Sequence, residues 1–374
     1  MRKSRLLVPA VLVAATAVVG GSARASADSG YPRVTANTNV AQNAKSPVRD
    51  LQTANIAVDP SDPNHIAVIG GDWRAGSCFL YVSTDGGASF AVGKQSPLPP
   101  QFDTCAPNGA TNPWGIGFDK AGNILVATLV ANRPSTASAS GSVILAKTTD
   151  NGNTWSTTFV QNNRQTNPPL GVGQVFLVSD IKNNRIYVGY QQRNVPVSGY
   201  NGGTQRRALI AVSTDDGASF SPGVDIEGDS SNTLSIGGPW PALGPDGTLY
   251  AYYSQSAAPK TASPVFTSQT PNLEVAKSTD GGKTYTSATI MPISKEPQFF
   301  GYSNFAVAPY KGGTAMVLEF EALAQGSTAS QNQVRDIYTI SSTDGGNTWG
   351  SPTRVTDDDI NTDLGSKFTP GISA

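Results

Sequence analysis

The sequence is poor in the residues from which metal centres and many hydrolytic active sites are built. It contains one histidine and two cysteines, and only 14% of its residues are charged, against about 25% in typical soluble domains. A structural zinc site usually takes four Cys or His ligands, and Ser-His chemistry would depend on His65 alone. The 26 Lys and Arg residues are balanced by 27 Asp and Glu residues, so the chain lacks the basic excess that neutralises phosphates. We therefore expect no metal, no cofactor and no nucleic-acid partner.

Long hydrophobic runs are also scarce. The apolar run from Leu6 to Gly20 follows three basic residues, and it is shorter than the roughly 20 residues that a membrane span needs. Small-residue sites of the type cleaved by signal peptidase follow at residues 23–25 and 25–27. We predict a signal peptide over residues 1–27, a secreted mature chain that begins near Asp28, and no membrane attachment after cleavage. An uncleaved anchor helix is the alternative.

Export changes the interpretation of the two cysteines, Cys78 and Cys105. Oxidising compartments permit disulfides, and a bridge that closes this short loop stabilises a fold by about 3 kcal/mol in the chain-entropy model. We predict that the two residues form a disulfide, with two buried free thiols as the alternative.

The most informative feature is an eight-residue segment that occurs five times. Each copy reads Ser/Thr-Thr-Asp-x-Gly-x-Ser/Thr followed by an aromatic residue. A nearly constant period of this kind indicates a repeat architecture. The aspartates of the five copies, spaced by 65, 65, 65 and 64 residues, are Asp85, Asp150, Asp215, Asp280 and Asp344.

Local chemistry explains each position of this segment. The Asp carboxylate accepts hydrogen bonds from backbone N–H groups just ahead of it, a Gly supplies a backbone angle that other residues avoid, and the aromatic residue covers the turn. Apolar strands flank every copy, and a second pair of strands around a polar turn precedes it, as in 55–58 and 65–69. Each repeat therefore holds four strands, which is one blade of a β-propeller.

The two ends of the mature chain resemble parts of a further blade. Residues 30–35 are similar to 350–356, which follow the fifth segment, and Lys367 to Ala374 resemble a first strand. We predict one all-β domain over residues 28–374, a six-bladed propeller whose last blade is incomplete. The alternatives are a chain that stops within a blade and a ring that closes on a partial blade, and an unpaired blade would expose strand edges.

The five segments resemble the Asp-box repeat of the sialidase superfamily, and the resemblance covers nearly all of the mature chain. It implies a secreted propeller that acts, as a monomer, on extracellular glycans or polysaccharides. It also implies that the five box aspartates are structural, because in the family they lie on the rim away from the active site. Two functions stay open: a glycoside hydrolase resembling exo-α-sialidase, and a non-catalytic propeller that binds glycan or protein.

The resemblance also suggests catalytic positions. Sialidases bind the substrate carboxylate with three arginines and use a Tyr nucleophile activated by a Glu, with an Asp as the acid/base. The first inner strand here, residues 53–58, has no Arg. Asp72 is the residue that matches the acid/base position, and Arg74 stands two residues later. We take both as catalytic candidates.

Propeller geometry suggests further candidates at the channel mouth, where inner strands begin and the loops between second and third strands meet. A second catalytic hypothesis is the pair Glu319 and Glu321, which lie two apart on one strand and therefore on one face, at about 7 Å, a separation that suits an inverting glycosidase. The loop at 359–363 has calcium-loop spacing but lacks the required Gly and acidic residues, so we predict no metal there. The candidates for substrate binding, whose aromatic members alternatively belong to the core between blades, are Trp73, Trp114, Arg193, Trp240 and Tyr302.

Overall fold

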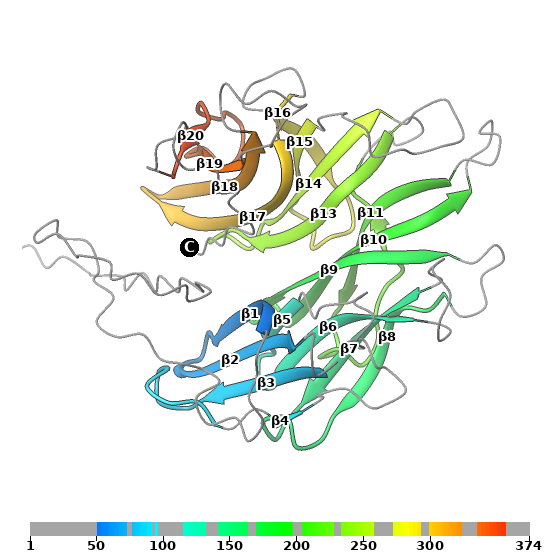
Figure 1. Cartoon of the computed structure of the whole chain (residues 1–374), viewed down its shortest axis with the longest axis vertical. Coiled ribbons are helices and arrows are strands. Elements are labelled where there is room, and N and C mark those ends of the chain that lie inside the picture. The colour runs from blue at the N-terminus through cyan, green and yellow to red at the C-terminus, as the bar shows by residue number, and fades with distance from the viewer. Residues whose placement is uncertain are drawn as a thin grey trace, which may run out of the picture.

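The chain folds as a β-propeller whose blades follow the five box repeats. The structure is a computed structural model, and it describes residues 51–72, 77–91, 94–95, 115–131, 141–163, 170–196, 204–227, 233–257, 272–292, 299–323 and 335–356. These residues form five four-stranded antiparallel sheets. Blades 1 and 2 lie in the lower part of Figure 1, blades 4 and 5 in the upper part, and blade 3 between them. The predicted all-β class and four-stranded blades are thus confirmed, with five blades in the described residues.

Each blade consists of four strands that are consecutive in the sequence and paired in that order. Blade 1 contains β1 (Leu51–Asp59), β2 (Asp62–Asp72), β3 (Ser77–Ser83) and β4 (Lys94–Gln95). Blade 2 contains β5 (Gly115–Phe118), β6 (Ile124–Ala131), β7 (Gly141–Thr148) and β8 (Ser156–Gln161). Blade 3 contains β9 (Gly171–Asp180), β10 (Arg185–Pro196), β11 (Thr204–Ser213) and β12 (Val224–Asp225). Blade 4 contains β13 (Thr233–Leu243), β14 (Leu249–Ala257), β15 (Asn272–Ser278) and β16 (Thr286–Met291). Blade 5 contains β17 (Phe299–Tyr310), β18 (Gly313–Leu323), β19 (Arg335–Ser342) and β20 (Thr353–Arg354).

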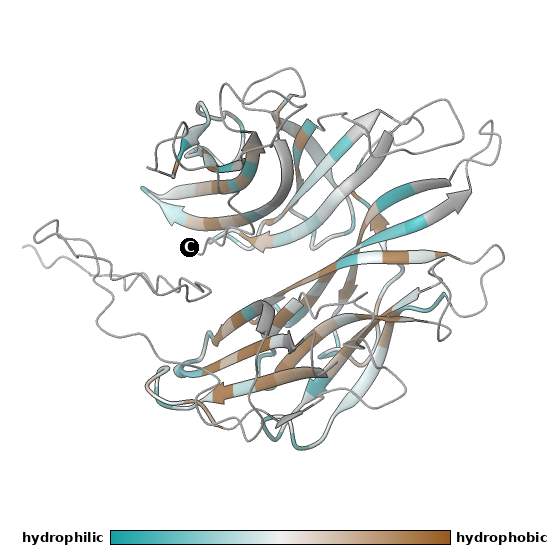
Figure 2. Ribbon diagram, viewed as in Figure 1, coloured by the Kyte–Doolittle hydropathy of each residue, from teal (hydrophilic) through white to brown (hydrophobic). Residues whose placement is uncertain are grey.

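The core lies between neighbouring blades. A middle strand such as β6 is buried on both faces, so its sequence is a continuous apolar run instead of an alternating one. Val126 packs in the cluster shared with blade 1, whereas the preceding residue, Leu125, packs in the cluster shared with blade 3. Figure 2 shows the apolar residues concentrated along these strands. Successive side chains of one strand therefore join two blades, because they point to opposite faces of the sheet.

The box turns have the hydrogen bonds that the sequence predicts. In the first copy, Asp85 accepts bonds from the Ser89 backbone N–H at 2.9 Å and from the Ser83 hydroxyl at 2.7 Å, while Ser83 accepts a bond from the Gly87 N–H at 2.9 Å. The Gly87 φ is +87°, in the region that favours glycine. The closing aromatic packs against the core in each copy. These residues are Phe90, Trp155, Phe220, Tyr285 and Trp349.

The outer strands begin at different distances from the box aromatic. β8 and β16 start directly after it, whereas β4, β12 and β20 have two residues each and start several residues later. The backbone N–H of Ser221 does bond to Val212, directly after Phe220, at 2.8 Å. Pro222 then interrupts the ladder, since proline has no N–H to donate. The outer edge is therefore bonded in short stretches.

Several sequence predictions fall outside the described residues. These are the signal peptide at 1–27, the segments at 30–35 and 367–374, the loop at 359–363, and Cys105. Cys78 is described and buried in β3, and its disulfide with Cys105 stays a prediction. Within the described ranges, no helix is long and apolar enough to cross a membrane.

Candidate functional site

The site with the most unusual electrostatics lies where blade 3 faces blade 4, and Arg193 is its central residue. Arg193 stands near the end of β10, opposite Gly171 at the start of β9. Its Nε donates a hydrogen bond of 2.9 Å to Oε1 of the fully buried Gln191. The guanidinium lies against the Cα of Gly173, where a side chain would leave it no room. Gln191 and Gly173 thus hold the guanidinium from two sides.

A second arginine, Arg206 on β11, is close to Arg193. Burial and, to a smaller extent, the positive charge of Arg193 together lower the pKa of Arg206 to about 10. Burial also lowers the pKa of Arg193. Among the described residues no carboxylate forms an ion pair with Arg193. Two partly desolvated cations side by side create a positive field that an anionic group would neutralise.

The backbone around these arginines is irregular, and inner strands of two blades are tied together there. Gln174 has a φ of +43°, and its side-chain Oε1 accepts a 2.7 Å bond from the backbone N–H of Gly238 in blade 4. Two residues further along both strands, Phe176 stacks on Trp240 with ring centroids 4.1 Å apart. Register shifts interrupt β10 and β13 in the same region. Such bulges re-aim side chains, and in sheets they are frequent beside functional sites.

This arrangement suits recognition of an anionic, planar or tetrahedral group. A guanidinium presents a fork of N–H donors that matches a carboxylate or sulfate, and the match is stronger where water is excluded. The same residues do not suit a metal ion, because they are cations and amides. No three His, Cys, Asp or Glu side chains of the described ranges are grouped so that they could hold a metal ion.

The sequence singled out Arg193 as a candidate for substrate binding, but it did not indicate which residues surround it. Gln191, Gly173 and Arg206 come from three different strands, and only the strand pairing brings them together. The one available signal was the Arg206-Arg207 pair at the start of an otherwise apolar strand. Arg207 is a different case, because it lies 3.7 Å from the carboxylate of Glu227.

Trp240 belongs to the interface between blades. Its ring is stacked on Phe176, and it packs against the core cluster of blades 4 and 5. This is the core position that the sequence left open as an alternative to sugar binding. Phe176 itself is buried.

Glu319 and Glu321 share one face of β18, as their spacing predicts, but that face points away from blade 4. The intervening Phe320 packs in the cluster between blades 4 and 5. Glu321 is completely buried, and burial raises the pKa of Glu319, one of whose oxygens has no hydrogen-bond partner. The pair is therefore not brought to Arg193, because blade 4 separates the two.

The remaining candidates are described in part or not at all. The backbone of Asp72 ends β2, opposite Leu51 and Ser77, and Tyr302 lies within β17; the side chains of both fall outside the described structure. Trp73, Arg74 and Trp114 also fall outside it. Their roles stay predictions.

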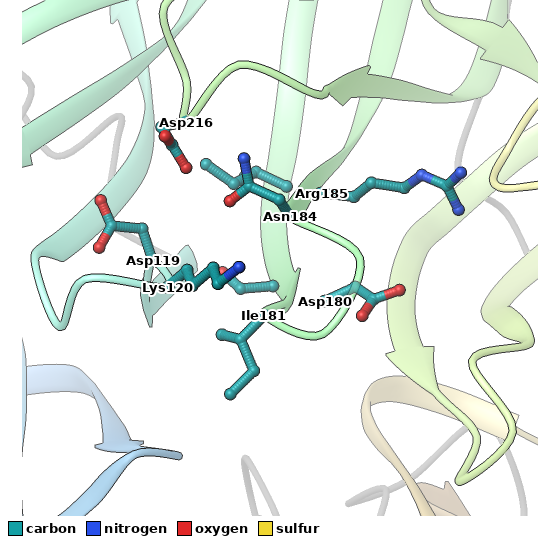
Figure 3. Close-up of a pocket in the computed structure, with 9 residues that line it drawn as sticks. Asp119, Lys120, Asp180, Ile181, Asn184, Arg185 and Asp216 are labelled. Carbon is teal, nitrogen blue, oxygen red and sulfur yellow. The ribbon is translucent and has the colours of Figure 1, made fainter.

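A small depression lies at the opposite ends of the same strands, between blades 2 and 3. It measures about 160 Å³ and is lined by the turn residues Asp119, Asp180 and Asp216 together with Arg185. Figure 3 shows Asp119 and Arg185 pointing to opposite sides of it. That volume includes open solvent, so the depression encloses no space for a ligand.

Comparison with known proteins gives structural likeness only. No family model matches the chain, and no curated protein matches it. Among solved structures, an α-L-arabinofuranosidase from Fusarium graminearum is 14% identical with a TM-score of 0.49, covering 78% of this chain and 77% of its own. A Hadza microbial sialidase is 15% identical with a TM-score of 0.39, covering 79% and 68%. An intramolecular trans-sialidase from Ruminococcus gnavus is 11% identical with a TM-score of 0.46, covering 65% and 70%. None of the three reaches a TM-score of 0.5, so the fold assignment rests on the blades described above.

Proposed function

We propose that the protein is a secreted, monomeric propeller that acts on extracellular glycans and holds an acidic sugar unit at Arg193 and Arg206. The observation that carries this proposal is the Arg193 guanidinium, which is partly desolvated, held by Gln191 and Gly173, and without a carboxylate partner among the described residues. Burying a cation without a counter-ion costs free energy. A carboxylate or sulfate ester on a sugar would offset that cost when it binds.

The polar groups around the arginines supply the rest of a sugar site. Sugars are bound through fixed hydrogen-bond partners on a rigid frame. The Gln174–Gly238 bond and the Phe176–Trp240 stack make the junction of blades 3 and 4 such a frame. If the protein hydrolyses glycans, Asp72 is the candidate acid at the mouth of the propeller channel. The second candidate function is glycan binding without hydrolysis.

The test is a panel of acidic glycans, with sialylated, uronic-acid and sulfated members, beside neutral glycans of the same size. Binding is measured by calorimetry and cleavage by mass spectrometry. We expect acidic glycans to bind and neutral ones to bind at least about tenfold more weakly, the factor for one hydrogen bond to a charged group. Arg193→Gln should remove the preference, whereas Lys120→Gln, an exposed change at the far ends of the strands, should keep it.

The outcomes separate the two functions. Cleavage that Asp72→Asn abolishes while binding persists supports a glycoside hydrolase. Binding without products supports a glycan-binding propeller. Equal binding of neutral and acidic glycans, or an Arg193→Gln variant that behaves like the unchanged protein, overturns the proposal.

A sixth blade between blades 5 and 1 forms part of this proposal. On blade 1, Val68, Phe79 and Tyr81 are buried on the face that points away from blade 2, and no described strand of another blade joins their cluster. On blade 5, Glu321 and Ile337 are buried on the face that points away from blade 4. Both faces have the burial of an interface between blades. We propose that the segments at 30–35 and 367–374 contribute to the blade that fills this position.

Limited proteolysis and mass spectrometry of the secreted protein test this part. Cleavage of residues 1–27 and protection of 30–35 from protease are the expected results. A mature protein of residues 28–374 should also unfold at higher urea than one of residues 51–356, because the latter exposes both faces. Equal urea midpoints would exclude the contribution of the two ends.

A further inference from the structure

The only histidine of the chain joins blade 1 to blade 2. His65 stands at the beginning of β2, and its Nδ1 lies 3.4 Å from Oδ2 of Asp59 in its own blade. Its Nε2 lies 3.3 Å from Oδ1 of Asn151, which belongs to the box turn of blade 2. The ring also meets the edge of Phe118, with centroids 4.8 Å apart. The imidazole thus faces an oxygen acceptor on each side.

The next two junctions have a Lys or an Arg side chain at the corresponding place. Lys147 of blade 2 donates a 3.3 Å bond to the backbone carbonyl of Asp216 in the box turn of blade 3. The guanidinium of Arg185 in blade 3 lies against Gly281 in the box turn of blade 4. The three contacts, from His65, Lys147 and Arg185, all end on the residue directly after a box aspartate. Only the first of them is an imidazole, the type of side chain whose charge ordinarily changes near neutral pH.

We infer that His65 is an acid-strengthened latch between blades 1 and 2. A neutral imidazole has one N–H, so it donates to either Asp59 or Asn151 and turns a lone pair toward the other oxygen. The protonated ring donates to both, and the bond to Asp59 becomes an ion pair. Acidification toward pH 5.5 therefore tightens this junction and leaves the other two unchanged.

The other charged groups near the ring are already engaged. Asp59 also accepts bonds from the Ser61 backbone and hydroxyl. In blade 2, Asp150 is bonded within its own turn and Asp119 is paired with Lys147. Asp62 and Lys120 are exposed. Among the residues that the structure describes, Asp59 is thus the one ionic partner of His65, and it stays ionised at pH 5.5 because its pKa is lowered.

Hydrogen exchange at the junction, combined with NMR of the single histidine, tests the latch in the tag-free mature protein. The imidazole signal reports ring protonation without assignment, since the chain has one His. After correction for intrinsic exchange rates, amides of residues 59–66 and 148–155 should exchange roughly tenfold more slowly at pH 5.5 than at pH 8. The change should follow the protonation of the ring.

The repeat itself supplies matched variants. Asn151→Gly copies the residue found after the box aspartate in blades 1, 4 and 5, so it suits the positive φ of 56° while removing the acceptor. Asn151→Asp copies blade 3 and places a carboxylate beside Nε2. We expect the first to reduce the pH effect and the second to enlarge it. His65→Gln should abolish it, and Arg185→Gln, at the junction of blades 3 and 4, should leave it unchanged.

Two results overturn the inference. One is equal protection of the blade 1–2 junction at pH 5.5 and pH 8, as expected if the Asn151 amide turns its NH₂ group to a neutral ring. The other is a pH effect that persists in His65→Gln, which would assign it to the carboxylates of the turns.

Discussion

The guanidinium of Arg193 lies directly on the Cα of Gly173. A β-carbon at residue 173 would overlap Nη2 and Cζ of Arg193. Atoms cannot approach so closely, so the arginine keeps this position only while residue 173 is glycine. The positive site therefore depends on the absence of a side chain on the neighbouring strand.

Gly173→Ala should displace the arginine and weaken acidic-glycan binding at least about tenfold, the factor for one lost charged hydrogen bond. The displaced group is the end of a flexible side chain, so the fold should lose little stability. Calorimetric titration measures the first effect and urea unfolding the second. Gly313→Ala is the control, because its nearest neighbour would be 3.6 Å away. Unchanged binding in Gly173→Ala would show that Arg193 does not contact the ligand.

Lys147→Met should destabilise the protein by about 2 kcal/mol. The ammonium lies 2.5 Å from the carboxylate of the buried Asp119, and its loss would leave that charge with its turn hydrogen bonds only. Urea unfolding measures the difference. Lys120→Met removes an exposed lysine from the same turn as Asp119 and should change stability little. Equal effects of the two substitutions would contradict a special role for the Lys147–Asp119 pair.

Acid should destabilise the protein through the box aspartates. Hydrogen bonds from Ser89, Ser83 and their counterparts lower the pKa of Asp85 and Asp344 from 3.8 to about 2. Because the folded pKa is below the unfolded one, this stabilisation is present above about pH 4 and is lost as pH falls through 2. Thermal melting between pH 6 and pH 2 measures the loss. Asp344→Asn should flatten the acid limb, and an unchanged curve would assign acid unfolding to other carboxylates.

Reduction should destabilise the protein by about 3 kcal/mol if Cys78 and Cys105 are bridged, since opening the bridge releases chain entropy in the unfolded state. Urea unfolding with and without a reducing agent gives the difference. Alkylation of the unfolded, unreduced protein should add no label, and two labels would instead show free thiols.

The blades and their turns were largely predictable from local sequence. The hydrogen bonds of the box turns join residues two to four positions apart, such as Ser83 with Asp85 and Asp85 with Ser89, so they follow from spacing alone. The outer strands were less predictable, because a residue such as Pro222 ends a ladder that hydrophobic pattern suggests.

The candidate site was predictable only in part. Alternation correctly placed Glu319 and Glu321 on one face of β18. Because blade 4 covers the opposite face through Phe320, the two carboxylates point away from blade 4, and the sequence did not show this. For Trp240, composition allowed either a sugar platform or a core position, and the stack on Phe176 is a relationship between two blades.

The sequence by itself determined the repeat, the strand count of each blade and the chemistry of the five turns, because all of these depend on contacts over a few residues. Tertiary structure alone decided the surroundings of Arg193. Its neighbours Gln191, Gly173 and Arg206 lie on three strands whose register includes bulges, and a one-residue slip would turn each side chain to the other face. The same holds for His65 and Asn151, which meet only because blade 2 packs against blade 1.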